Sequence, residues 1–326
     1  MRRLLALLDT PAGRAARYAC SALLVAALVW SIDWPQFIAL RGKFDGGLVA
    51  LATLLAGLAF PLQAWRWWLL LRAQGLTLSL PWAHLATWIG NFYNAFLLGG
   101  LGGDAVRAFA LCRDAPTRRA AGLAATFLDR VMGLIVLLSL AALTLLLKLD
   151  AVARHAELRL LLALCAALSV AGVVGFVFLC RQPPPWLARR LGPTRTAALA
   201  DILARAHSTP LALALALASS YAIWLLDFLS VWLLARSLGL PLPFIEVSLA
   251  MSVAYAATVL PVSVGGHGIR EGALLAMLAL LGLLPDDTSR QLALLLAVLV
   301  WATSVFWSLV GGAVLLLTRR SVPPSR

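Results

Sequence analysis

The chain has 326 residues, of which 62% are hydrophobic and 13% are charged. Several continuous apolar runs, rich in Leu and Ala, exceed the roughly 20 residues that a membrane-spanning helix needs, which excludes a soluble protein and argues against an outer-membrane barrel. The net charge of +13 comes from arginines in short loops beside these runs, so it indicates topology signals and lipid headgroup contacts rather than nucleic-acid binding.

The sequence therefore predicts an all-α, polytopic membrane protein that forms a single transmembrane domain over residues 1–326. Residues 1–17 resemble a short interfacial piece, and the first apolar run is expected to be a retained span rather than a cleaved signal peptide. About six full spans are predicted, near residues 18–34, 47–70, 120–148, 158–180, 210–235 and 291–318.

Residues 81–112 are predicted to form a first helical hairpin, either re-entrant or fully crossing. One helix runs to about Leu98 and a short helix that carries Arg107 starts at Asp104. The break between them contains four glycines: Gly99, Gly100, Gly102 and Gly103. A broken helix at membrane depth is tolerated only where protein or a water-filled cavity surrounds the backbone, so the break indicates a polar site. Asn94, just before it, is expected to bond the loosened backbone.

The third predicted span carries two adjacent charges, Asp129 and Arg130, at about 15 Å depth for a rise of ~1.5 Å per residue. Adjacent helix residues do not face each other, so each charge needs a partner elsewhere. The candidate partners are Arg107 or Arg270 for Asp129, and Asp104 or Glu271 for Arg130.

Two further segments follow. Residues 181–209 form the longest polar loop, with a helix-compatible stretch that is expected to lie on the cytoplasmic membrane surface. Residues 242–284 are predicted to form a second hairpin, with one helix to about Leu260 and another from near Gly268. Its break carries Gly265, Gly266, His267, Gly268, Arg270 and Glu271. Paired breaks in corresponding halves are typical of a transporter's substrate site.

The number of spans between the hairpins sets their relative orientation. Three predicted spans separate them, an odd number, so the two hairpins are expected to open to opposite sides. Of the 27 Lys and Arg residues, 18 fall on the side of the N-terminus, Arg66 and Arg107 among them, and eight on the other side. The positive-inside rule then predicts cytoplasmic N- and C-termini in a bacterial inner membrane.

Each break exposes backbone N–H groups at a helix start, which with the helix dipole form an anion site for a group such as a lipid phosphate. Arg107 and Arg270 follow within one turn and offer planar donor forks suited to phosphate. The alternatives are that Arg107 sets topology and that Arg270 pairs with Glu271. Asp104 and Glu271 can also act as helix caps. The glycines of the predicted backbone anion site are Gly99, Gly100, Gly102, Gly103, Gly265, Gly266 and Gly268.

His267 is a candidate proton carrier, although a histidine beside glycines is more often a cap or packing residue. Asp227, inside the predicted span 210–235, is a second candidate. The four cysteines lack metal-site spacing and no Walker motif is present, so we expect no metal, no cofactor and no ATP hydrolysis.

At these motifs the chain resembles the lysylphosphatidylglycerol synthase transmembrane-domain family, the flippase-like membrane proteins related to the membrane half of the multiple peptide resistance factor. The residues that carry the resemblance are Asn94 with Gly99–Arg107, then Asp129-Arg130, then Leu260–Glu271. The resemblance implies a module that moves lipids, such as aminoacylated phosphatidylglycerol, hopanoid-type or polyprenyl-linked lipids, between leaflets. It does not imply lysyl transfer, which needs the soluble synthase domain of the family.

The sequence thus favours an inner-membrane lipid flippase or transporter, not an enzyme. Its expected substrate-contacting residues are Asp104, Arg107, Asp129, Arg130, His267, Arg270 and Glu271. Two other functions stay open. One is a membrane accessory protein or transferase that presents a lipid to a lipid-modifying partner enzyme, and the other is a small-solute secondary transporter.

Overall fold

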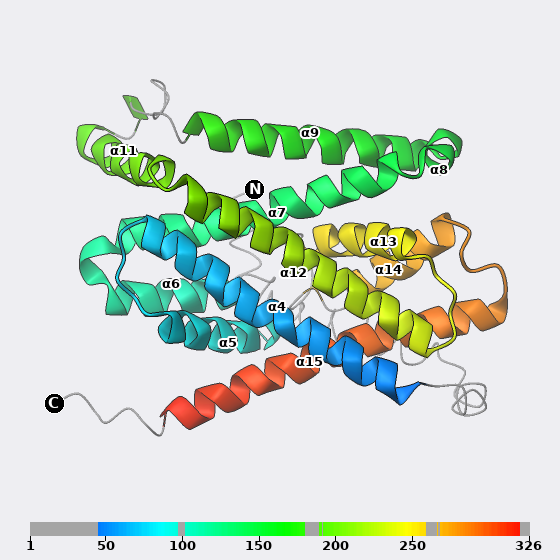
Figure 1. Ribbon diagram of the computed structural model, residues 1–326. Coiled ribbons are helices and arrows are strands. Elements are labelled where there is room, and N and C mark those ends of the chain that lie inside the picture. The colour runs from blue at the N-terminus through cyan, green and yellow to red at the C-terminus, as the bar shows by residue number, and fades with distance from the viewer. Residues whose placement is uncertain are drawn as a thin grey trace, which may run out of the picture. The chain divides into compact units, whose positions relative to one another are not determined.

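The computed structural model describes residues 45–96, 102–179, 189–190, 192–258, 266 and 268–319. Every regular element within these ranges is a helix (Figure 1). Five of the helices are long and apolar enough to cross a membrane. The prediction of a polytopic helical membrane protein is therefore confirmed, while the predicted span 18–34 lies outside the described residues.

The five spans correspond to five of the six predicted crossings, with ends displaced by a few residues. A 3-10 turn, η2 (Pro116–Arg118), leads directly into α7. The spanning helices are α4 (Gly46–Ala73), α7 (Arg119–Leu146), α9 (Ala156–Leu179), α12 (Pro210–Ser237) and α15 (Asp287–Arg319). Their lengths follow from the apolar runs, because a helix must satisfy its own backbone hydrogen bonds across the hydrocarbon.

Helices flank both glycine-rich breaks. They are α5 (Leu80–Phe96) and α6 (Gly102–Asp114) at the first break, and α13 (Phe244–Ala257) and α14 (Ile269–Leu280) at the second. The other helices are α8 (Leu149–Arg154) and α11 (Pro193–His207), the latter in the long polar loop. The opposite orientation of the two helix pairs stays a prediction.

The chain forms two compact units, each assembled from separate segments. The first unit comprises residues 1–58, 88–105 and 225–326, and the second comprises residues 59–87 and 106–224.

The core of the second unit is built on the C-terminal half of α4. Trp67, Leu70 and Leu71 of this helix are fully or almost fully buried, together with Leu111 of α6 and Ala125 of α7. Helix α9 packs along α7 (Figure 1). Its opposite face exposes large apolar side chains, which is the surface expected of a helix that meets lipid.

In the first unit, α14 packs against both α13 and α15. A buried hydroxyl group and a partly buried indole group join other helices. Ser230 Oγ on α12 donates a 2.8 Å hydrogen bond to the Ala52 carbonyl, and Trp307 Nε1 on α15 donates one of 2.8 Å to the Thr53 carbonyl. These bonds satisfy polar groups that would otherwise be costly inside an apolar bundle.

Candidate functional site

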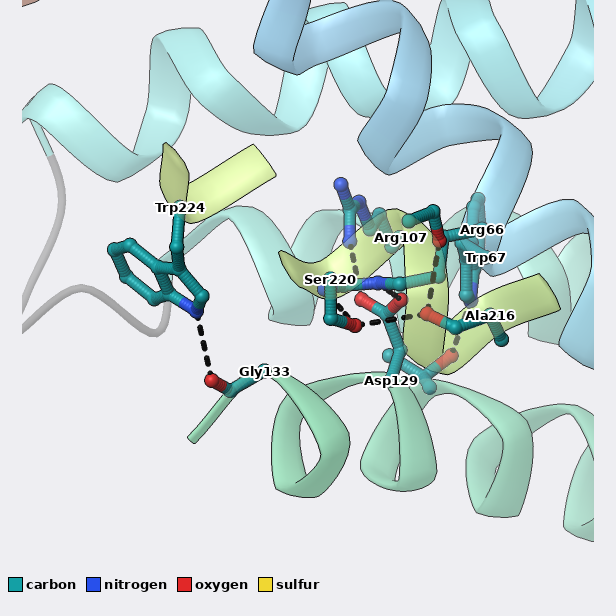
Figure 2. Close-up of polar contacts among 10 residues, drawn as sticks. Arg66, Trp67, Arg107, Asp129, Gly133, Ala216, Ser220 and Trp224 are labelled. Carbon is teal, nitrogen blue, oxygen red and sulfur yellow. Dashed lines mark hydrogen bonds and ion pairs between the residues drawn. The ribbon is translucent and has the colours of Figure 1, made fainter. Parts of the chain in front are cut away.

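A buried ionic cluster lies where three helices of the second unit meet. Asp129 of α7 accepts a 2.7 Å hydrogen bond from Arg66 Nε of α4 on one carboxylate oxygen. Its other oxygen lies 3.4 Å from Arg107 Nη1 of α6, so both guanidinium groups point at one carboxylate (Figure 2). Only 4–5% of the surface of each residue is exposed. We call Arg66, Arg107 and Asp129 the Asp129 cluster.

Neighbouring polar and aromatic groups fix the two arginines. Arg66 Nη1 donates to Ser220 Oγ of α12 at 2.9 Å, and Ser220 Oγ in turn donates to the Ala216 carbonyl (Figure 2). The Arg107 guanidinium lies over the Trp67 ring, 5.1 Å from its centroid, a favourable cation–π geometry. Trp67 Nε1 donates to Thr126 Oγ1 at 3.1 Å, which holds the ring in place.

Burying the charges of the Asp129 cluster costs free energy, so their presence inside the helices needs an explanation. Each charge in a membrane span costs about 2.5 to 3.5 kcal/mol on insertion scales, and ion pairs inside low-dielectric protein rarely repay their full desolvation. One carboxylate that holds two guanidinium groups offsets much of this cost. Intramembrane ionic groups of this kind are functional candidates by default.

The structure selects among the partners predicted for the adjacent charges. Of the two arginines expected to serve Asp129, Arg107 makes the contact. Arg130 lies on an exposed part of α7, because successive helix residues point about 100° apart. Asp104 is half-buried in the first turn of α6. The pairing of Arg130 with Asp104 or Glu271 stays a prediction.

Arg66 is the member of the cluster that sequence reasoning missed. Its assignment to the loop charges that set topology is wrong, since it lies inside α4 and is only 5% exposed. The signal was present, because Arg66 falls within the predicted span 47–70. An arginine within a predicted span needs an anionic partner and belongs with Asp129.

At the first break, α5 and α6 approach each other closely. The Gly103 N–H donates a 2.7 Å hydrogen bond to Asn94 Oδ1, so the expectation that Asn94 bonds loosened backbone is confirmed. A Cβ atom added at Gly103 would lie 2.5 Å from the Gly90 carbonyl oxygen, so only glycine allows this approach. The Gly103 N–H, part of the predicted anion site, is therefore already hydrogen-bonded to the Asn94 side chain. Gly99 and Gly100 lie outside the described residues.

At the second break, Glu271 holds both the backbone and the neighbouring arginine. Its Oε2 accepts a 2.7 Å hydrogen bond from the Gly268 N–H, which caps α14. Its Oε1 lies 2.6 Å from Arg270 Nη2 and 3.0 Å from Arg270 Nε. The structure thus shows the pairing of Arg270 with Glu271. The Gly268 N–H of the predicted anion site is bonded to the Glu271 carboxylate. Gly265 and His267 lie outside the described residues.

Arg270 also interacts with three other helices of the first unit. Its Nη1 donates to Ser304 Oγ of α15 at 2.9 Å, and its guanidinium lies 5.7 Å from the ring centroid of Tyr255 on α13. Asp227 of α12 interacts electrostatically with this arginine. We call Asp227, Tyr255, Arg270, Glu271 and Ser304 the Arg270 cluster.

The two breaks share a chemical arrangement. Each is followed within one helical turn by a buried arginine, Arg107 or Arg270, whose guanidinium is held by a carboxylate. A phosphate has the same planar, bidentate complementarity to a guanidinium as a carboxylate has. An anionic group that reaches either cluster can therefore compete with the resident carboxylate for the arginine.

Comparison with known proteins adds a family assignment. The family model described as the lysylphosphatidylglycerol synthase TM region matches residues 14–312. The matched model covers the membrane region of that family, and no catalytic domain is detected. A search of curated proteins finds no match.

Proposed function

Since this chain belongs to the lysylphosphatidylglycerol synthase TM region family, we propose that it is a flippase or transporter that moves an anionic or modified lipid between membrane leaflets. The observation that carries the proposal is the Asp129 cluster. It places two guanidinium groups around one carboxylate inside apolar helices, directly after a glycine-rich break.

The cluster supplies the two properties that lipid transfer needs. Arginine side chains recognise phosphate through paired, charge-assisted hydrogen bonds. Asp129 offsets part of their positive charge when no lipid is bound, which lowers the cost of holding two cations in apolar surroundings. In the proposed cycle, the headgroup phosphate replaces Asp129 as the partner of Arg107, while the acyl chains stay in the surrounding lipid.

Arg270 and Glu271 are proposed to act in the same way at the second break. Their ion pair is shorter, 2.6 Å against 3.4 Å for Arg107 and Asp129, and Glu271 is fully buried. Arg107 is therefore the easier of the two arginines for a phosphate to capture. The proposed orientation has both termini in the cytoplasm, as the distribution of basic residues favours.

Lipid movement is tested most directly in reconstituted vesicles. The purified full chain is inserted into liposomes that contain labelled phosphatidylglycerol, lysyl-phosphatidylglycerol or phosphatidylcholine, and a membrane-impermeant quencher reports the label in the outer leaflet. We expect the wild-type protein to speed exchange of at least one anionic or modified lipid. Asp129→Asn and Arg107→Ala should return the rate to that of empty liposomes.

Asp287→Asn is the matched control, because the Asp287 side chain is 93% exposed in a surface ion pair. It should transport like wild type. Wild-type rates in both cluster variants would remove the Asp129 cluster from the mechanism. An inert wild-type protein across the panel would favour the accessory or transferase function, and uptake of soluble substrate without leaflet exchange would favour a small-solute transporter.

A further inference from the structure

Two arginines converge on the turn that follows α4, far from the Asp129 cluster. Arg118 Nη1 donates to the Gln74 carbonyl at 3.1 Å. A Cβ atom added at Gly75 would lie 2.6 Å from Arg118 Nη1 and 3.1 Å from Arg205 Nη1, so both guanidinium groups approach the same point. The bare backbone of Gly75 leaves room for them.

The protein itself uses only part of the capacity of these two groups. Arg205 Nε donates to Asp201 Oδ2 at 2.8 Å, an exposed contact within α11. Arg118 has no carboxylate within 4.0 Å in the part of the chain that the structure describes. The pKa of Asp201 is lowered, first by the hydrogen bond from Arg205 and also by the charge of Arg118. One carboxylate thus interacts with two cations, and each guanidinium group has further N–H donors besides the one used in these bonds.

The position of this pair along the spans indicates what it meets. One membrane span ends at Ala73, another begins at Pro116 and a third begins at Pro210, so the two arginines lie beside three span ends. Gln74 Nε2 donates to the Ile202 carbonyl at 3.1 Å and joins the end of α4 to α11. Basic residues at span ends lie at the level of the lipid phosphates. Along α7, Asp129 lies about 16 Å deeper.

We propose that Arg118 and Arg205 bind the phosphate of an anionic phospholipid in the adjacent leaflet, as a resident lipid distinct from any lipid that is transported. Two guanidinium groups that approach one point suit the several oxygens of a phosphate. The bound lipid would join α4, α7 and α11 at this edge of the second unit. The proposal needs only the membrane assignment and does not depend on the proposed transport function.

The test is native mass spectrometry of the purified, delipidated full chain titrated with phosphatidylglycerol or phosphatidylcholine. We expect wild type to retain phosphatidylglycerol in preference to phosphatidylcholine. The double variant R118Q/R205Q should bind phosphatidylglycerol about ten-fold more weakly, since it loses charge-assisted hydrogen bonds. R118K/R205K should bind better than R118Q/R205Q, which separates loss of charge from misfolding. R290Q, which removes another exposed, ion-paired arginine, should bind like wild type.

Three outcomes would overturn the proposal. The first is equal phosphatidylglycerol affinity in R118Q/R205Q and wild type. The second is displacement of the lipid by millimolar inorganic phosphate, which would identify a site for soluble anions. The third is loss of the same lipid in Asp129→Asn, which would place it at the Asp129 cluster instead. Because Asp129→Asn is also the variant expected to lose transport, normal lipid retention in it would separate this proposal from the transport proposal.

Discussion

At the scale of single residues, both arginines that follow the glycine breaks are held by carboxylates, but by carboxylates of different origin. Arg107 is paired with Asp129, from another helix and 22 positions away in sequence. Arg270 is paired with its own neighbour Glu271. A partner on another helix moves away when helices shift, whereas a sequence neighbour moves with the arginine. The Asp129 cluster is therefore the one whose contacts a conformational change can exchange.

The Asp129 cluster predicts a large stability cost for the loss of its carboxylate. Asp129→Asn leaves two buried guanidinium groups without their shared anion, and breaking a buried ion pair costs about 3 to 5 kcal/mol. We expect a loss of about 3 kcal/mol, because the amide oxygen still accepts one hydrogen bond. Thermal unfolding of the detergent-purified variant measures it. The exposed control Asp287→Asn should stay within about 0.5 kcal/mol of wild type, and an equally small effect at Asp129 would contradict the burial of the cluster.

A second prediction concerns the two carboxylates near Arg270. Glu271→Gln removes its ion pair, and Asp227→Asn removes the other carboxyl group that interacts electrostatically with it. Because both variants act on one cation, their effects on the free energy of unfolding should not add, with a coupling of about 0.5 to 3 kcal/mol. A double-mutant cycle with both single variants and the double variant measures this coupling. Additive effects would show that Asp227 does not share the arginine.

At the scale of helices, the glycines of the first break act mainly through packing. Gly103 lies against the Gly90 backbone, and its N–H is bonded by Asn94. The motif that suggested an open anion site therefore first serves to bring α5 and α6 together. Phosphate recognition then depends on the arginine side chain that this approach positions.

Gly103→Ala should accordingly destabilise the protein by about 1 to 3 kcal/mol, the usual cost of overpacking, since its Cβ atom would meet backbone that has no side chain to move aside. Gly272→Ala is the matched control, a helical glycine near the start of α14 with no atom within 4 Å of the added Cβ. It should be neutral or stabilise by up to about 1 kcal/mol. Thermal unfolding compares them, and equal behaviour of the two variants would contradict the close approach.

The helices were predictable from sequence to the extent that hydrocarbon thickness determines them. Five apolar runs correspond to five spans because each run is long enough, as a helix, to cross the hydrocarbon core of the bilayer. The site was only partly predictable. Asp129 was found because two adjacent charges, Asp129 and Arg130, are conspicuous within a span, whereas Arg66 was assigned to the loop charges. Which backbone N–H groups are occupied, as at Gly103 and Gly268, depends on side-chain contacts that spacing does not reveal.

At the scale of the whole molecule, orientation in the membrane is the property on which the proposed transport cycle most depends. The positive-inside rule counts basic residues near span ends, and Arg66 and Arg107 both drop out of that count because they are buried in the Asp129 cluster. The remaining excess at the ends of α4, α6 and α11 still favours the cytoplasm for these ends. Asp150 in α8 and Asp286 just before α15 are then predicted to face the opposite compartment.

Single cysteines test this orientation directly. In a background in which all four native cysteines are replaced, Asp150→Cys, Asp286→Cys and Asp201→Cys each place a thiol at an exposed position. In spheroplasts, a membrane-impermeant maleimide should label positions 150 and 286 at once and position 201 only after the membrane is permeabilised. Positions 150 and 286 are separated by α9, α12 and one hairpin, an even number of predicted crossings, so both should be labelled alike. Labelling of position 286 but not of position 150 would mean an odd number of crossings between these two positions and, with α7 added, an even number between the two glycine breaks. The breaks would then open to the same side, and an inverted arrangement would be excluded.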